Sequence, residues 1–132
     1  MKFTLLIQSA PIDSQSSATA LRFARALLSK GHEIERLFFY RSGVQSANRL
    51  ALAPQDETNL PADWQQLISE FELDAVVCIA AAIRRGVVNA TETARYGVEG
   101  DNLLENAELS GLGQLVAACA ASDRVVTFGG GA

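Results

Sequence analysis

Two cysteines carry the most distinctive chemistry in this sequence. Cys78 and Cys119 lie far apart in the chain, with no CxxC pair and no cluster of histidine and cysteine. A structural zinc site needs several such ligands at close spacing, so the sequence argues against one. A structural disulfide is not expected in a reducing compartment. The question is therefore whether either free thiol is reactive.

Cys78 is the candidate nucleophile. It lies late in an apolar run from Asp74 to Ala80, a pattern typical of a strand covered on both faces of a parallel sheet. The functional crevice of an open α/β sheet lies beyond the carboxyl ends of its strands, so the thiol is expected near that edge. If the next segment forms a helix, its first amide groups would face the sulfur. Arg84 and Arg85 add positive charge, and each of these features would favour the reactive thiolate.

The residues alone leave a second interpretation of Cys78 open, as a small buried hydrophobe of the sheet. Cys119 is different, because it takes the fourth place in an apolar stripe at helical spacing with Leu112, Leu115 and Val116, and this predicts a position in the core. A dithiol oxidoreductase needs a resolving thiol, which a core position for Cys119 disfavours. A single reactive thiol favours a carrier of sulfur or acyl groups.

The remaining motifs are weaker. His32 follows Gly31 at an expected helix-to-strand turn, which is typical of a surface residue rather than a catalytic base. Gly111 and Gly113 are expected to allow close packing at the start of the last helix, since no GxGxxG or GxxxxGKS motif follows the first strand. We expect no metal and no organic cofactor.

Alternating strands and helices must position these residues. Hydrophobic periodicity predicts strands at residues 3–8, 33–40, 74–80 and 124–128, with room for a fifth, and helices at 16–30, 61–71, 91–96 and from about 110. The buried face of the second helix is expected to hold Trp64, Leu67, Ile68 and Phe71. The sequence thus predicts a single doubly wound α/β domain, with a mostly parallel sheet of four to five strands and helices on both faces. This domain is expected to span residues 1–128, followed by a flexible tail at 129–132.

Charge and hydropathy restrict the function further. The net charge of −4 argues against direct nucleic-acid binding, because phosphate recognition needs a cationic face. No run of about 20 apolar residues occurs, so no membrane span is expected. The apolar run at residues 3–7 is too short for a signal peptide. The expected location is the cytoplasm.

Six short segments carry a more specific pattern. Residues 31–34, 38–40 and 43–44 read Gly-His-Glu-Ile, Phe-Phe-Tyr and Gly-Val; residues 77–87 read Val-Cys-Ile-Ala-Ala-Ala-Ile-Arg-Arg-Gly-Val; residues 109–115 and 123–126 read Leu-Ser-Gly-Leu-Gly-Gln-Leu and Asp-Arg-Val-Val. Together they resemble the TusD/DsrE family of bacterial sulfur-relay proteins over nearly the whole chain. Cys78 takes the position of the family's active cysteine.

The resemblance implies a sulfurtransferase of DsrE-type fold that carries sulfane sulfur as a persulfide on Cys78. It implies TusB/TusC-like or DsrH/DsrF-like subunits in a dimer of heterotrimers, a TusA-like sulfur donor and a TusE- or DsrC-like acceptor. The expected end of the relay is 2-thiouridine at the tRNA wobble position. Arg84, Arg85 and backbone amides are the expected stabilisers of the sulfur anions.

Three alternatives stay open. The chain could instead be the DsrE subunit of a DsrEFH complex in dissimilatory sulfur oxidation. It could also be a non-catalytic assembly subunit, with the apolar segment 38–40 as interface, although core is the preferred place for that segment. A nucleotide-binding flavodoxin-like module is disfavoured by the missing phosphate loop.

Overall fold

One parallel sheet forms the centre of the molecule, in a computed structural model that describes residues 1–12 and 14–130. Its strands are β1 (Lys2–Ile7), β2 (Glu33–Phe39), β3 (Ala75–Cys78), β4 (Ala107–Ser110) and β5 (Arg124–Phe128). They pair in the order β4-β3-β2-β1-β5, each parallel to its neighbour. The α/β fold predicted from the sequence is confirmed, and β4 is the fifth strand for which the sequence left room.

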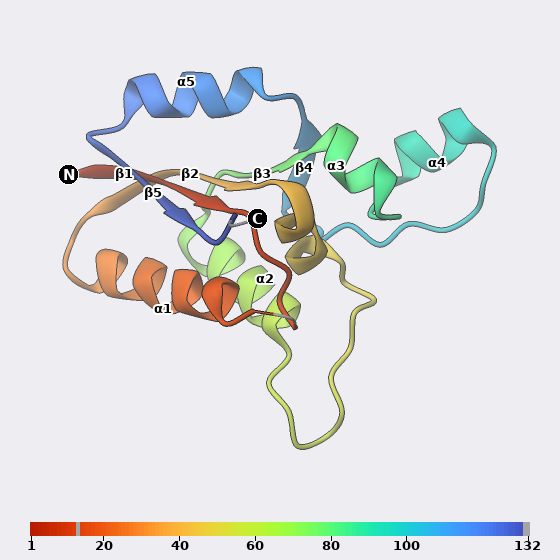
Figure 1. Cartoon of the computed structure of the whole chain (residues 1–132), viewed down its shortest axis with the longest axis horizontal. Helices are drawn as coiled ribbons and strands as arrows, with labels where there is room; N and C mark the ends of the chain where they lie inside the picture. The colour runs from red at the N-terminus through yellow and green to blue at the C-terminus, as the bar shows by residue number, and fades with distance from the viewer. Residues whose placement is uncertain (13, 131–132) are drawn as a thin grey trace.

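The helices surround this sheet unevenly (Figure 1). Two helices cover one face, α1 (Ser16–Ser29) and α2 (Leu60–Phe71), and a single helix, α5 (Gly113–Ala121), crosses the other. The remaining short helices are η1 (Arg41–Ala47, a 3-10 helix), α3 (Ile79–Arg84) and α4 (Ala90–Tyr96). Figure 1 shows α3 and α4 reaching outward past the end of β3. None of the helices in the described residues is long and apolar enough to cross a membrane.

The core lies between the sheet and the layer formed by α1 and α2. Phe38 and Phe39 at the end of β2 are fully buried, as is Trp64 of α2. The rings of Phe39 and Trp64 meet edge to face with their centroids 5.4 Å apart, an arrangement that adds to the energy of area burial. Segment 38–40 therefore contributes to the core at its first two positions.

A buried chain of polar side chains links three helices. The indole Nε1 of Trp64 donates a hydrogen bond to Ser17 Oγ at 3.2 Å, and Ser17 Oγ lies 2.8 Å from Ser46 Oγ. Both serines are fully buried, so each satisfies the other where water is excluded. This chain fixes η1 against α1 and α2.

A glycine lets η1 lie directly on the end of β1. A Cβ added to Gly43 would overlap the backbone carbonyl of Ile7, so any larger residue would push η1 away from the sheet. The same carbonyl accepts a hydrogen bond from the Tyr40 N–H at 2.9 Å. Close backbone approach is the physical role of Gly43.

The last helix departs from its expected orientation. Only Ala118 of α5 is buried, whereas Val116 is 68% exposed and Cys119 is exposed. The prediction that Cys119 lies in the core was therefore wrong. Residues 113–121 contain no charged side chain and one polar side chain, Gln114, so the periodicity of the helix could not identify its buried face.

Two smaller expectations also differ, and a third is untested. Phe71, expected in the buried face of α2, is 46% exposed. Gly111 and Gly113 have open space where a Cβ would lie, so close packing does not explain them. In the expected tail, a Cβ on Gly129 would overlap Ser9 Oγ, and Gly130 lies similarly against Gln8. Residues 131–132 of that tail lie outside the described residues, and the flexibility of the tail stays a prediction.

Candidate functional site

Cys78 lies at a junction where a strand passes into a helix without a loop. It is the last residue of β3, and α3 begins at Ile79. In the sheet it is paired with Ser110, the last residue of β4. The cysteine is thus at the carboxyl edge, as expected from the sequence. It is 4% exposed, so the thiol lies just below the surface.

The helix predicted to follow Cys78 is present but short. Cys78 is its N-cap residue, and its side chain makes no capping hydrogen bond within the described part of the chain. Ala81 and Ala82 are buried on the inner side of α3, which packs against η1. Their small side chains allow η1 to hold α3 close to the sheet. The position of the sulfur is therefore set by β3, α3 and η1 together.

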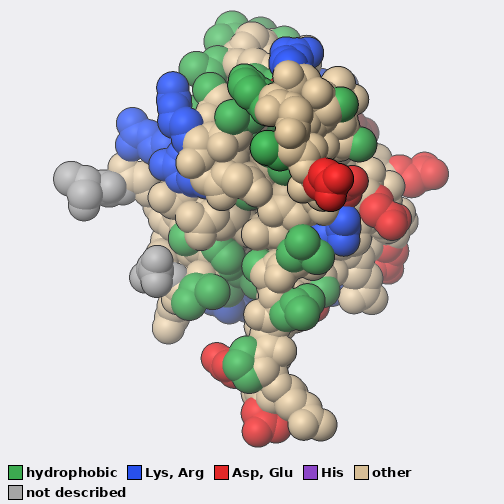
Figure 2. All heavy atoms as spheres, turned by 90° about the vertical axis from the view of Figure 1, so that its right-hand side faces the viewer, with side chains coloured by type: hydrophobic (Ala, Val, Ile, Leu, Met, Phe, Trp, Pro, Cys, Tyr) green, Lys and Arg blue, Asp and Glu red, His purple; other side chains and the backbone are tan. Residues whose placement is uncertain are grey.

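The two arginines after Cys78 have different surroundings. Both are exposed. Arg85 Nη1 donates a hydrogen bond to the Ala81 carbonyl at 3.1 Å, so its guanidinium is turned back onto α3. Arg84 instead lines a hollow beside the helix. Figure 2 looks at the molecule from this side and shows a group of lysine and arginine side chains gathered on one flank.

This hollow lies between α3 and α4 and begins at the residue after Cys78. Its volume is about 360 Å³, and we call it the α3–α4 hollow; it is lined by Ile79, Ala80, Ile83, Arg84, Glu92, Arg95 and Tyr96. Glu92 is 4% exposed. Sequence reasoning missed this residue, although a glutamate three positions after a helix-capping asparagine was the available signal.

Hydrogen bonds from the loop after α4 hold this helix in place, and we call those made by Asn102 the clamp. Asn102 Oδ1 accepts a hydrogen bond from the Val88 N–H at 2.8 Å, and Asn102 Nδ2 donates one to the Gly86 carbonyl at 2.8 Å. Backbone bonds from Asn102 and Leu103 to the Val88 carbonyl complete the clamp. The segments that enter and leave α4 are therefore joined, which fixes one wall of the α3–α4 hollow.

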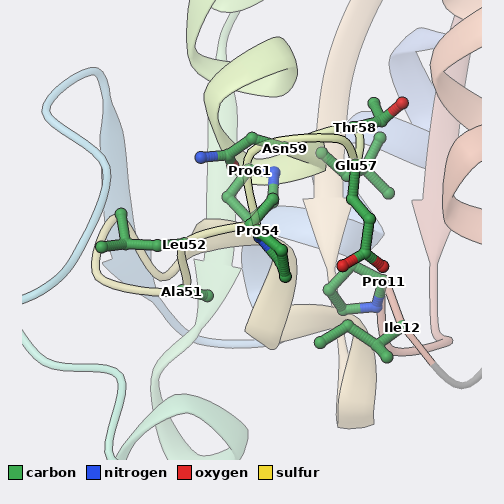
Figure 3. A pocket seen from close by; sticks show the side chains of 11 residues that line it. Pro11, Ile12, Ala51, Leu52, Pro54, Glu57, Thr58, Asn59 and Pro61 are labelled. Atoms are coloured by element: carbon green, nitrogen blue, oxygen red, sulfur yellow. The ribbon is translucent and has the colours of Figure 1, made fainter.

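A second cavity lies away from Cys78 (Figure 3). It has a volume of about 280 Å³ between the loop after β1 and residues 51–61, and its described lining is mostly apolar. In Figure 3 the Glu57 side chain reaches toward Pro11, with Ile12 nearby, while Leu52 lies on the opposite side of the view beside Ala51. No cysteine or histidine is found in this described lining.

The other residues singled out from the sequence are separate from this edge. His32 lies at the turn before β2, with its Nδ1 3.2 Å from the N-terminal nitrogen of Met1, as a partly exposed turn residue. Both cysteines are free thiols. Within residues 1–12 and 14–130, no group of three or more histidine, cysteine, aspartate or glutamate side chains is arranged to hold a metal ion.

Comparison with known proteins gives several relatives that are named sulfurtransferases. The model of the DsrE/DsrF-like family matches residues 1–128. A sulfurtransferase TusD homolog of Pseudomonas aeruginosa is 54% identical, with 98% of each chain covered. A putative sulfurtransferase DsrE of Allochromatium vinosum is 47% identical, over 98% of this chain and 99% of the relative. The sulfurtransferase TusD of Cronobacter sakazakii is 44% identical, over 97% of this chain and all of the relative.

Solved structures show the same fold at lower identity. The crystal structure of the ychN protein from E. coli superposes with a TM-score of 0.74 at 22% identity, over 97% of this chain and 99% of that chain. A conserved protein of unknown function from Bacteroides thetaiotaomicron gives a TM-score of 0.55 at 13% identity, over 96% and 94% of the two chains. With its full-length matches to the sulfurtransferases TusD and DsrE, the chain belongs to the DsrE/DsrF-like family.

Proposed function

We propose that this protein is a sulfur-relay sulfurtransferase that carries sulfane sulfur as a persulfide on Cys78. The observation that carries the proposal is the place of this cysteine. It ends a central strand at the carboxyl edge of the sheet and adjoins the α3–α4 hollow through Ile79. Cys119, the other thiol, lies on α5, outside the cysteine segment at residues 77–87, and has no part in the proposal.

The chemistry is two successive thiol exchanges. The Cys78 thiolate attacks the outer sulfur of a donor persulfide, the sulfur–sulfur bond of the donor breaks, and the donor leaves as a thiolate. An acceptor thiolate then bonds to the outer sulfur of the Cys78 persulfide, and Cys78 leaves as a thiolate. Sulfane sulfur moves and no external electrons are needed. Stabilising the thiolate of Cys78 assists its departure, and the exposed Arg84, which lines the adjoining hollow, is the proposed source of positive charge.

The finer steps follow from the family resemblance. A TusA-like protein would supply the sulfur, and a TusE- or DsrC-like protein would accept it. Thiolation of the tRNA wobble uridine is the preferred end of the relay, and the DsrE branch of sulfur oxidation is the alternative. TusB/TusC-like or DsrH/DsrF-like subunits would complete a dimer of heterotrimers in the cytoplasm.

The surface of α5 supports assembly with other subunits. Val116 of α5, Leu112 before it and Val125 of β5 are 68%, 45% and 41% exposed. Exposed apolar side chains that form a contiguous patch mark contacts with other proteins, and we propose that these three belong to one such patch. The same exposed residues would also support a non-catalytic assembly role. An experiment that separates the two roles must therefore measure the chemistry of the Cys78 thiol.

Intact-mass measurement after incubation with a persulfide donor tests the proposal. The wild-type chain should gain the mass of one or more sulfur atoms, and a reductant should remove the gain. Cys78→Ser should fold normally and gain none at that position, while Cys119→Ser should load like the wild type. Normal loading of Cys78→Ser would overturn the proposal. A wild type that stays unloaded even when co-expressed with its partner subunits would favour the assembly role.

A further inference from the structure

The α3–α4 hollow is lined by a glutamate that has an unpartnered carboxylate oxygen. Glu92 is 4% exposed, and its Oε2 is buried with no hydrogen-bond donor among the described residues. Its Oε1 lies 3.8 Å from Arg95 Nη2, which is too long for a hydrogen bond. A buried charged acceptor left without a donor destabilises a protein, so its presence calls for an explanation.

The usual structural role of a glutamate at this position does not explain Glu92. Asn89 caps α4, and its Oδ1 accepts a hydrogen bond from the Glu92 N–H at 2.9 Å. In a capping box the glutamate carboxylate would in turn accept from the Asn89 N–H. No such bond occurs among the hydrogen bonds of the described residues, and the Glu92 side chain lines the hollow instead.

The rim of the hollow carries the opposite charge. Arg84 is exposed and the Arg95 side chain is 64% exposed, and both line the hollow with Tyr96. A simple cation would be repelled by the two guanidinium groups, and a simple anion by the Glu92 carboxylate. A suitable ligand donates a hydrogen bond inward and carries negative charge outward. A peptide with a free backbone N–H beside an acidic side chain has both properties.

We propose that the α3–α4 hollow binds an acidic segment of the thiol-bearing partner protein. Glu92 Oε2 accepts a hydrogen bond from the segment, and Arg84 and Arg95 bind its carboxylate. The inference rests on the proposed function, because Ile79, which lines the hollow, directly follows Cys78. A segment held there brings its thiol next to the carrier cysteine.

Titration of the full-length chain with two peptides, followed by heteronuclear NMR, tests the inference. Both are blocked pentapeptides with one cysteine; one has two glutamates after it and the other two glutamines. The acidic peptide should bind more tightly, with shifts concentrated at the amides of Ile79, Ala80 and Ile83. Replacing Glu92→Gln should weaken the binding of both peptides about tenfold, the effect of losing one charge-assisted hydrogen bond. Replacing Arg84→Gln should remove the preference for the acidic peptide.

Matched controls separate a local effect from a general change of charge. Glu70→Gln on α2 and Arg25→Gln on α1 alter exposed residues outside the hollow and should leave both affinities unchanged. The spectra also report whether each variant is folded. Equal binding of the two peptides, or unchanged binding by a folded Glu92→Gln variant, would overturn the inference. Loading of Cys78 is measured separately by mass, so failure of the carrier role remains distinguishable from failure of this site.

Discussion

Cys78 and Ser110 are paired in register as the last residues of two adjacent parallel strands, β3 and β4. The thiol is consequently enclosed by the end of the sheet and by α3, and Cys78 is only 4% exposed. Cys119 has the reverse environment, on an exposed surface of α5. The two thiols of one chain therefore differ in access to solvent, and this difference can be measured.

Alkylation should distinguish the two cysteines. With iodoacetamide on the folded chain, Cys119 should react first and Cys78 markedly more slowly, because the reagent must reach a buried sulfur. Peptide mass spectrometry over time gives both rates, and a denatured sample, in which both thiols are open, is the control. Faster labelling of Cys78 in the folded protein would show that the strand–helix junction opens readily in solution.

The close contact of η1 with β1 predicts a sensitive glycine. Gly43→Ala would place a Cβ against the Ile7 carbonyl and should destabilise the fold by about 1–3 kcal/mol, the usual cost of overpacking. Gly111→Ala is the matched control, since open space surrounds that position. Urea unfolding of both variants gives the comparison. Equal midpoints for Gly43→Ala and the wild type would contradict the proposed contact.

The buried polar chain predicts a second stability effect. Ser17→Ala removes the acceptor for Trp64 Nε1 and the partner of Ser46, leaving buried polar groups unsatisfied. We expect a loss of about 1–3 kcal/mol in the free energy of unfolding. Ser29→Ala, at an exposed position on the same helix, is the control and should have a much smaller effect. Thermal unfolding followed by tryptophan fluorescence measures both.

The clamp at Asn102 predicts a local effect rather than a global one. Asn102→Ala removes two side-chain hydrogen bonds that join the segments flanking α4. Amide hydrogen exchange should become faster at Val88 and along α4, while the strands stay protected. Asn106→Ala, which removes a bond to Ser69 on α2, should leave α4 unchanged. Uniformly faster exchange in Asn102→Ala would show that the clamp supports the whole fold.

Much of the fold could be predicted because strands and helices here have clear boundaries. Apolar runs in the sequence predicted β1, β2, β3 and β5. Gly97 adopts the left-handed conformation at the predicted end of α4. The bounds of β4 could not be predicted, because its four residues are not fully buried and include Glu108. The orientation of α5 could not be predicted, because an apolar helix without charges has no distinct polar face.

The candidate site was predictable in part. The place of Cys78 at the carboxyl edge follows from the apolar run and from the general arrangement of parallel sheets. The different directions of Arg84 and Arg85 do not, because they depend on a hydrogen bond within α3. Spacing could single out Glu92, three positions after the capping Asn89, but it could not predict its burial, which requires α4 to fold back beside α3 under the clamp of Asn102.

The absence of any linking residue between β3 and α3 has a consequence for the proposed transfer of sulfur through Cys78. Cys78 is attached to two regular elements at once, so its backbone cannot swing toward a distant partner as a cysteine on a long loop could. In the proposed relay, the donor and acceptor cysteines must therefore approach Cys78 themselves, on flexible segments long enough to reach it and to withdraw. The rate of sulfur transfer would then depend on the mobility of the donor and acceptor proteins rather than on motion in this chain.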